Sequence, residues 1–438
     1  MPKIRSGFRS ERRAIRRAVG ITAVAAVGVI GLAACSSGAS SGGGSSSAGQ
    51  TIQPAVGKGA ITLTEYDYYT SSSEEGAIET AISAFEKKYP NVKIERETAP
   101  YPAITKLVTL ESAGNTPNIV IDDQDYLSQY YAGLVPLTTF FTPSFINEYL
   151  PGGTESATLG GQEYGLQVLG GNDTALIYNK TDFAKAGIKE PPATWAELEA
   201  DAAKLTDPKE NRYGLALSGS QQEGSTWQLE PFVWSDGGTL SNPGGAPWHQ
   251  AMDLWTQMMQ AGSIPKAVTG WEQTDEESHF LTGNVAMQLN GPWEISQLQQ
   301  SGIQWGVAPY PTKSPGQTLS VPIGGEAWSV GRSTPEKEAA SAAFIQFLTN
   351  DTALNVQLTN AMGYLPALKS ESASYAAKYP MYAVFADEFK NGKARVYGQN
   401  YLKVSTDIQV MIGNVLSGSQ SVNQGLSTLQ GQVSAIPG

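Results

Sequence analysis

The alternation of apolar and polar positions over residues 61–95 predicts a strand, a polar loop, a helix and a second strand. Residues 61–66 give an apolar run that suits a buried strand. Residues 78–89 repeat apolar side chains at helical spacing, so one face of a helix packs inward. Pro90 ends that helix, and residues 92–95 resume the alternation of a strand. This stretch therefore predicts the opening unit of an α/β domain.

The loop between the first strand and the helix is rich in hydroxyl and carboxyl groups. Ser72 and Glu75 stand at the S-x-x-E spacing of a capping box, in which each side chain satisfies a free backbone donor at a helix start. Ligands of open α/β sheets bind where the carboxyl end of a strand meets the amino end of a helix. Ser72, Ser73 and Glu74 are therefore candidate ligand contacts, and a solvated, well-capped turn is the alternative interpretation.

A second strand delivers carboxylates in the same way. Residues 118–121 form an apolar run that ends at Asp122 and Asp123. If the two strands are parallel, Glu74 and this pair of aspartates share one edge of the sheet.

The same patterns predict an α/β chain over its whole length. A capping box of Thr194 and Glu197 begins one helix, and Met252, Trp255 and Met259 form a stripe that favours core over a binding site. Further helices are predicted at residues 100–110, 126–131, 194–205, 248–260, 272–281, 335–348 and 401–416, and strands at 175–178, 214–217, 285–289 and 327–330.

Length, charge and composition limit the kinds of partner that the chain is expected to bind. The chain has 438 residues, enough for two or three domains. Residues 1–34 carry seven basic residues and one acid, so the remainder has a formal charge of −18. Because such a body repels phosphates, no nucleic-acid partner is expected. With two histidines and one cysteine, neither a metal site nor a cofactor is expected.

The amino-terminal end predicts export and a lipid anchor. A basic segment precedes the apolar run Val19–Leu32, which suits a signal peptide and is short for a membrane span. The run ends in Leu-Ala-Ala-Cys, which resembles the bacterial lipobox and implies a signal peptide of residues 1–34 with lipidation at Cys35, the single cysteine. A signal peptide cleaved elsewhere is the alternative. Residues 35–58, rich in Ser and Gly, then form a flexible tether.

The expected location is the extracellular face of the bacterial cytoplasmic membrane, with the protein held there through its lipid anchor. The sequence predicts no further membrane span, because no later run of about 20 apolar residues occurs. The export route, general secretory or twin-arginine, stays open.

Ordered stretches along nearly the whole mature chain resemble the extracellular solute-binding proteins, family 1, of carbohydrate ABC importers, the relatives of maltose-binding protein. The resemblance is carried by AFEKKYPNVKIE, TPNIVIDDQDYLSQYYAGLVPL, ALIYNKTDFAKAGIKEPPATWAEL, FLTGNVAMQLNGPWEI, WGVAPYP, PIGGEAWSVGRSTPEKEAASAAFIQFL and MGYLPAL. It implies a type II periplasmic-binding-protein fold, in which a hinge joins two α/β lobes with a ligand cleft between them. By resemblance lobe 1 is expected at 59–170 and 326–375, and lobe 2 at 171–325 and 376–438.

The resemblance also assigns ligand contacts. Glu74 and Asp123 fall where the first-lobe carboxylates of the family accept sugar hydroxyls, Trp293 falls in a Gly-Pro-Trp loop as the aromatic platform, and Arg395 matches an arginine that reaches the ligand. Aromatic rings cover the CH-rich faces of sugars, and planar polar groups bind their hydroxyls. Tyr364 and Trp234 are further candidates.

Two positions depart from the family pattern. Asn172 lies near the hinge, where relatives often have aspartate. Gly325 and Glu326 occupy a double-glycine hinge position where some relatives carry tryptophan, so a hydrogen-bonding group replaces a stacking surface.

The implied function is that of a monomeric substrate-binding lipoprotein, not an enzyme. It would capture a monosaccharide or oligosaccharide between its lobes and deliver it to the transmembrane subunits of an ABC permease, with ligand favouring the closed state. Two alternatives stay open: a secreted glycoside hydrolase that uses paired carboxylates, and capture of ferric ion or another small anion by the same fold, with Tyr68-Tyr69 and Tyr130-Tyr131 as iron ligands. Neither the sugar nor the permease follows from the sequence.

Overall fold

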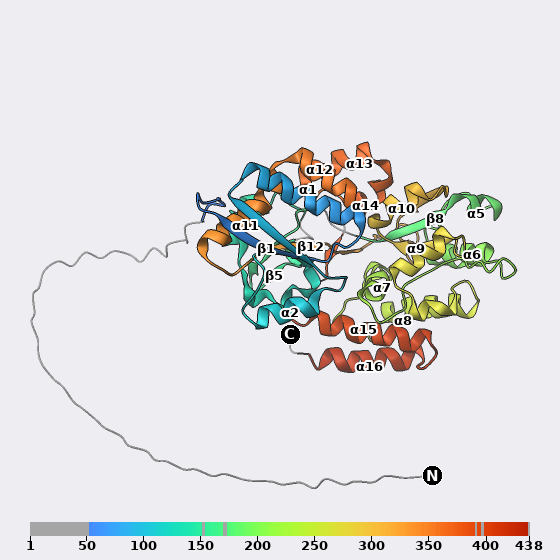
Figure 1. Ribbon diagram of the computed structural model, residues 1–438. Helices are drawn as coiled ribbons and strands as arrows, with labels where there is room; N and C mark the ends of the chain where they lie inside the picture. The colour runs from blue at the N-terminus through green and yellow to red at the C-terminus, as the bar shows by residue number, and fades with distance from the viewer. Residues whose placement is uncertain (1–51, 151–153, 170–172, 390–391, 396–397, 437–438) are drawn as a thin grey trace, which may run out of the picture. The chain divides into compact units, whose positions relative to one another are not determined.

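The computed structural model describes residues 52–436 except 151–153, 170–172, 390–391 and 396–397. Its larger sheet, in which β1 and β12 are labelled in Figure 1, has the strand order β2-β1-β3-β12-β4, and β7 also pairs with β12. β1 is parallel to β2 and β3, whereas β12 is antiparallel to β3, β4 and β7. The six strands are β1 (Ile61–Asp67), β2 (Val92–Thr98), β3 (Ile119–Asp123), β4 (Leu134–Val135), β7 (Gly165–Leu166) and β12 (Glu326–Gly331). We call the part built on this sheet the first lobe.

The parallel pairing of β1 and β3 confirms that their carboxyl ends meet at one edge of the sheet. Helix α1 (Ser72–Lys88) begins at that edge, but its cap differs from the sequence prediction. Ser71 is the N-cap and Glu74 closes the capping box, so the predicted pair of Ser72 and Glu75 is wrong by one residue. The serine run offers two S-x-x-E pairs, and spacing alone does not choose between them.

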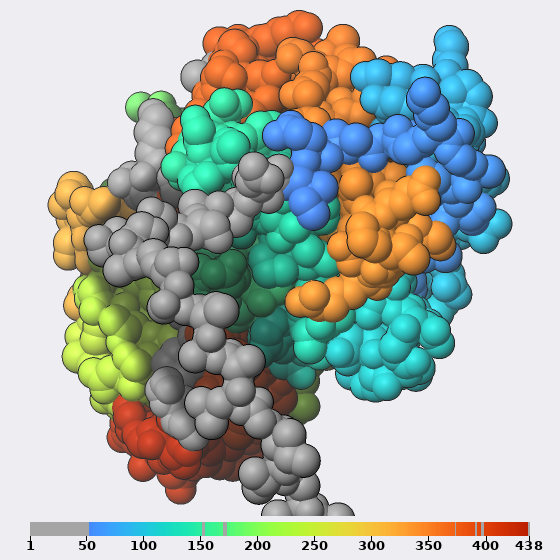
Figure 2. Space-filling view, turned by 90° about the vertical axis from the view of Figure 1, so that its left-hand side faces the viewer, coloured from blue at the N-terminus to red at the C-terminus, as the bar shows by residue number. Residues whose placement is uncertain are grey.

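Helices cover the first sheet and bury its apolar side chains. Ile78 and Phe85 of α1 and Phe344 of α11 share one apolar cluster with strand residues of β1, β3 and β12. The helices of this lobe are α1, α2 (Ile104–Ser112), α3 (Pro143–Ile146), α11 (Pro335–Asn350) and α12 (Thr352–Met362). The first described residues run beside α11, where the Ala55 amide donates to the Ala339 carbonyl oxygen at 3.2 Å (Figure 2).

The second lobe is built on an antiparallel sheet of order β10-β8-β9, formed by β8 (Ala175–Asn179), β9 (Met287–Asn290) and β10 (Trp305–Ala308). The predicted capping box of Thr194 and Glu197 is confirmed at the start of α6. Its helices are α5 (Lys180–Lys185), α6 (Trp195–Leu205), α7 (Glu223–Ser235), α8 (Ala246–Gln260), α9 (Gln273–Leu281), α10 (Ile295–Gln300), α15 (Tyr401–Leu416) and α16 (Val422–Ser434).

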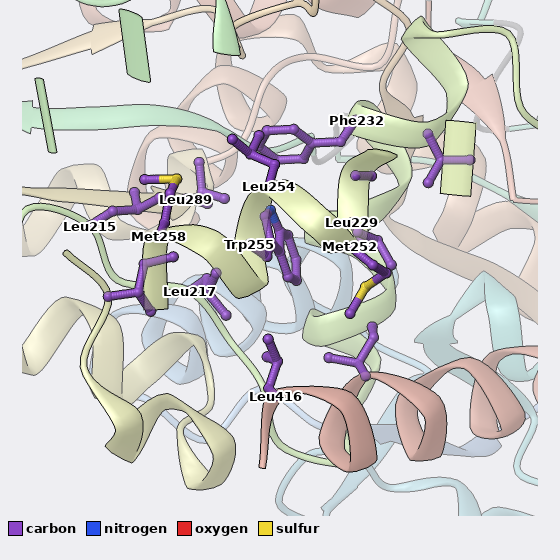
Figure 3. Close-up of a cluster of buried hydrophobic side chains, with 14 of the residues drawn as sticks. Leu215, Leu217, Leu229, Phe232, Met252, Leu254, Trp255, Met258, Leu289 and Leu416 are labelled. Atoms are coloured by element: carbon purple, nitrogen blue, oxygen red, sulfur yellow. The ribbon is translucent and has the colours of Figure 1, made fainter. Parts of the chain in front are cut away.

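The core of the second lobe centres on α8. Trp255 is fully buried and lies among Leu229 and Phe232 of α7 and Leu416 of α15 (Figure 3). The prediction that the Met252, Trp255 and Met259 stripe is core is therefore confirmed. This packing joins α15 and α16, which come last in the chain, to helices encoded much earlier.

Two further local predictions were wrong, and one helix was not predicted. Residues 214–217 form no strand, and Ala216 makes an isolated parallel bridge to Gln288 of β9. The helix predicted at 126–131 is a 3-10 helix over Gln124–Gln129. The sequence pattern did not predict α7, because buried residues occur all around it and no apolar stripe marks one face.

Short elements connect the two lobes. Strand β11 (Pro322–Ile323) precedes β12 and pairs in parallel with β13 (Lys393–Ala394). A separate apolar cluster packs α13 (Lys369–Lys378) and α14 (Ala383–Glu388) against the start of β8. The remaining elements are β5 (Thr158–Leu159), β6 (Gln162–Glu163) and the 3-10 helices η1 (Gln124–Gln129), η2 (Tyr131–Gly133), η3 (Leu137–Thr139), η4 (Lys266–Gly270), η5 (Pro292–Glu294) and η6 (Pro380–Tyr382).

No helix in the described part of the chain has the length and apolar character that crossing a membrane requires.

Candidate functional site

Glu326 is a carboxylate at the start of β12, the last strand along the chain to join the larger sheet. Glu326 begins β12 and stands opposite Asp123 in the register with β3. Its Oε1 accepts hydrogen bonds from the hydroxyls of Tyr68, at 2.5 Å, and Tyr364, at 3.1 Å. Burial raises the pKa of Glu326 to about 7, and the negative charge of Asp123 acts in the same direction. The structure thus brings the predicted Asp123, Glu326 and Tyr364 together.

Glu74 lies at the amino end of α1, half-buried. Its Oε2 accepts hydrogen bonds from the hydroxyl of Ser71 at 2.6 Å and from the Ser71 amide at 3.4 Å. Burial raises the pKa of Glu74. Ser72 and Ser73 lie in the exposed first turn, and the Ser73 hydroxyl is 3.4 Å from that of Ser71.

The second lobe contributes a further buried carboxylate. Glu294 follows Trp293 in η5 and is buried. Burial raises the pKa of Glu294 most, and the charges of Glu277 and Glu74 raise it further. Sequence reasoning missed Glu294, although the neighbouring Trp293 was among the candidates.

Arg395 is enclosed by carboxylates from both lobes. Its fully buried guanidinium pairs with Asp125, with Glu223 at 2.9 Å between Nη1 and Oε1, and with Asp123 at 3.7 Å between Nη2 and Oδ1. Asp123 and Asp125 flank the end of β3, whereas Glu223 begins α7. Contact between Arg395 and a ligand stays a prediction; what the structure shows is an ion-pair network between the lobes.

Side chains of helix α15 donate further hydrogen bonds to Glu223. The Tyr401 hydroxyl donates to Oε1 at 2.5 Å, and the Ser405 hydroxyl and Gln409 amide donate to Oε2 at 2.6 and 3.2 Å. Burial raises the pKa of Glu223, and Arg395 and the hydrogen bonds oppose that shift. Asp125 and Glu223 could not be found from local patterns, because their partner comes from a distant part of the chain.

Two tryptophans adjoin this network. The Arg395 guanidinium lies 4.4 Å from the centre of the Trp227 ring, whose other neighbour is Trp293 at 5.5 Å between ring centres. Trp293 belongs to the second lobe, yet it packs against the apolar cluster of the first lobe. The predicted aromatic platform therefore lies at the junction, and Trp227 is an addition that sequence reasoning did not single out.

Tyrosines form the first-lobe wall. Tyr101 meets Tyr68 edge-on at 5.2 Å between ring centres, and its hydroxyl is 3.3 Å from that of Tyr126. Tyr101 is 43% exposed, which is unusual for a large ring in this protein. It lines a cavity of about 130 Å³ together with the first-lobe residue Pro102 and second-lobe residues Ser218, Gln222, Gly224, Glu272, Gln273 and Thr274. This cavity between the lobes presents an aromatic face opposite amide, hydroxyl and carboxyl groups.

Of the predicted residues, Trp234 lies away from the others and Gly325 acts through its backbone. Trp234 belongs to the second-lobe core cluster and borders another cavity, of about 230 Å³, with Lys393 5.9 Å from its ring centre. It is not grouped with Glu74 and Glu326. Gly325 has a positive φ of 128°, which glycine tolerates, and its carbonyl oxygen accepts from the Gln124 amide at 3.2 Å. Asn172, Cys35, the signal peptide and residues 35–51 of the tether lie outside the described residues.

In the described part of the chain, no cluster of three or more His, Cys, Asp or Glu side chains has a geometry that could hold a metal ion.

Comparison with known proteins agrees with this architecture. The family described as "Bacterial extracellular solute-binding protein" matches residues 80–386. A binding protein of Brucella abortus (strain 2308) is 28% identical over 329 residues, covering 72% of this chain and 77% of the relative. The maltodextrin-binding protein of Bacillus subtilis (strain 168) is 25% identical over 386 residues, covering 83% and 81%.

Solved structures show the same fold. Maltose-bound MalE3 of T. maritima has a TM-score of 0.77 at 22% identity, covering 86% of this chain and 99% of that one. The cyclic alpha-maltosyl-1,6-maltose binding protein of Arthrobacter globiformis has a TM-score of 0.72 at 23% identity, covering 86% and 99%. These likenesses confirm the predicted type II fold of two α/β lobes.

Proposed function

The chain belongs to the bacterial extracellular solute-binding proteins, and we propose that it captures a sugar or oligosaccharide between its lobes and delivers it to an ABC permease. The observation that carries the sugar assignment is the cavity between the lobes, where the exposed ring of Tyr101 faces polar second-lobe side chains. Aromatic faces bury the apolar side of a sugar ring, and amide and carboxyl groups bind two neighbouring hydroxyls. Two curated relatives are named for maltotriose and maltodextrin.

Besides Tyr101 in this cavity, the ligand contacts are proposed at the residues predicted from the sequence, which lie outside the lining of the cavity. Glu74, Asp123, Glu326 and Tyr364 would meet hydroxyls, and Trp293 would cover a ring face. Ser72, Ser73, Asn172, Gly325 and Arg395 complete the proposed set, with Trp234 the most distant member. The lobes are proposed at residues 59–170 with 326–375 and 171–325 with 376–438.

The protein acts outside the cytoplasm, in keeping with its extracellular family. We further propose that it is a monomer anchored through lipidated Cys35, that the permease recognises its closed form, and that it carries out no reaction on the ligand. Ligand would favour closure, because only the closed state offers contacts from both lobes.

Calorimetric titration with mono- and oligosaccharides tests the proposal, together with X-ray scattering and chromatography of the recovered sugar. We expect binding, a smaller radius of gyration at saturation, a higher melting temperature and unchanged sugar. Cleaved sugar would overturn it in favour of a hydrolase, and an unchanged radius with bound sugar would contradict closure.

A matched pair of variants locates the site. Tyr101→Ala removes the exposed ring and is expected to weaken sugar binding about tenfold, because the buried ring face is lost. Tyr89→Ala is the control: Tyr89 lies at the opposite end of α1 from Glu74, packed on Phe85 at 4.8 Å, and binding should stay within about twofold of wild type.

A further inference from the structure

A second cavity lies wholly within the second lobe. Its volume is about 500 Å³, compared with about 130 Å³ for the cavity between the lobes, and the two cavities share no lining residue. Its walls come from the end of α8, from η4, from α9 and from the loops that flank these helices. Pockets that bind small organic molecules usually measure roughly 300–1,000 Å³. This cavity therefore has the size of a ligand site of its own.

Hydrogen bonds to the backbone hold the walls of this cavity in place. The Tyr213 amide donates to the Asn284 carbonyl oxygen at 2.8 Å. The Trp271 carbonyl oxygen accepts from the Ser218 hydroxyl at 3.1 Å and from the Ser220 amide at 3.3 Å. The cavity is therefore formed by the fold itself, as ligand pockets usually are.

The lining of the second-lobe cavity is mostly apolar and includes stacked rings. The Trp271 and His279 rings lie 4.0 Å apart between their centres, with 17° between their planes. Tyr213, Ile264 and Pro265 add further apolar surface. Aromatic ligands bury a large apolar area and pack against such rings in offset or edge-on arrangements. The lining therefore favours a ligand with an aromatic body.

The charge of the lining is positive. Lys266 and His279 line the cavity and no carboxylate does, although the chain has 41 Asp and Glu residues. Within the described part of the chain, neither Lys266 nor His279 forms an ion pair. The cavity between the lobes differs, since Glu272 is the charged residue of its lining. A single lysine matches one negative charge, whereas phosphate groups are usually bound by arginine or by several backbone amides.

We propose that the second-lobe cavity binds a small organic monocarboxylate with an aromatic body. The aromatic body would pack in the apolar lining beside Trp271, and the carboxylate would pair with the exposed Lys266. The lining offers a saccharide no carboxylate for its hydroxyls, which favours the aromatic acid. Because the two cavities have separate linings, this proposal does not depend on sugar capture between the lobes.

Calorimetric titration at pH 7 with indole-3-acetate, indole-3-acetamide and acetate tests the proposal. The first two probes share one ring system and differ in charge, and acetate carries the charge without the ring. We expect indole-3-acetate to bind about tenfold more tightly than the amide, because a hydrogen bond to a charged group is the stronger one. Acetate should give no measurable binding, because it buries almost no apolar surface.

Variants assign the binding to this cavity. Lys266→Met removes the charge and keeps an apolar stem, so the preference for the acid over the amide should fall about tenfold while amide binding is unchanged. Ala267→Trp places a large ring in the cavity from an exposed position of η4, and both indoles should no longer bind. Lys209→Met is the control: it removes an exposed second-lobe lysine outside the lining and should change neither affinity.

Each contrary result would overturn the proposal. Failure of indole-3-acetate to bind, or equal binding of acid and amide, would exclude an aromatic acid as the ligand. Binding that persists in Ala267→Trp would place the ligand elsewhere. A neutral saccharide whose binding is lost in Ala267→Trp would identify a second sugar site instead. Sugar capture between the lobes is tested by its own titrations and stands or falls separately.

Discussion

Glu326 is a buried carboxyl group with two tyrosine donors on one oxygen. Burial raises its pKa from the ordinary 4.5 to about 7. Between these values the folded chain holds a proton that the unfolded chain releases. The contribution of Glu326 to stability is therefore full below pH 4.5 and is lost as the pH rises through about 7.

Glu326→Gln removes this titration and keeps a carbonyl oxygen that can accept from both tyrosines. As the pH rises from 4.5 to 8, wild type should lose the contribution of Glu326 and the variant should not. We therefore expect the unfolding free energy of the variant to rise by about 2–3 kcal/mol relative to that of wild type over this range. Urea denaturation of both proteins across that range measures the difference. Since other buried acids titrate in both chains, the difference is the informative quantity. A difference independent of pH would contradict the prediction.

At the residue scale, the sequence identified side chains that follow strand ends, and it missed those defined by distant partners. Glu74, Asp123 and Glu326 stand at predictable ends of strands or helices. Glu223 lies 172 residues from Arg395 in sequence, and no local pattern links the two. The exposure of Tyr101 likewise depends on how the second lobe stands opposite it, which periodicity does not report.

At the element scale, the start of α1 offers a direct test of its corrected cap. Ser71→Ala removes the side-chain acceptor for the Glu74 amide and the donor to its carboxylate. We expect a loss of about 1 kcal/mol of unfolding free energy, measured by thermal or urea denaturation. Ser72→Ala is the matched control and should change stability by less than about 0.5 kcal/mol. A larger loss of unfolding free energy for Ser72→Ala than for Ser71→Ala would instead support Ser72 as the N-cap.

Helices with one apolar stripe were predictable, and elements buried on several sides were not. α8 and α15 lie close to their expected residues because their polar faces meet water. α7 is buried along most of its length and contains Pro231, so both the stripe and the propensity signals fail. Two-residue strands such as β7, β11 and β13 exist only through their partners and have no pattern of their own.

At the scale of the whole molecule, Arg395 links the carboxylates of both lobes. Arg395→Met leaves Asp125 and Glu223 buried without their cation, so we expect a loss of about 3–5 kcal/mol of unfolding free energy at pH 7. Lys403→Met is the control. It removes an exposed pair with Asp407, 2.8 Å apart, and should cost about 0.5 kcal/mol or less. Denaturation curves of wild type and both variants measure these losses. Equal losses for the two variants would contradict the ion-pair network around Arg395.

The two-lobe fold was predictable from the ordered resemblance along the chain, whereas composition and periodicity gave only the α/β class. Local patterns supply strands and helices, but the strand order β2-β1-β3-β12-β4 joins segments far apart in sequence. That order is a property of tertiary packing, and only comparison with a known family supplies it in advance.

The place of β12 has a consequence for biosynthesis. A ribosome that has translated residues 1–325 has made β8, β9 and β10, which are all three strands of the smaller sheet. It has also made β3 and β4, but not the strand that separates them. Their facing edges stay unpaired until residue 331 has left the exit tunnel. The half that is translated first is thus the half whose sheet closes last, and nascent chains halted before that residue should be cut by protease within it.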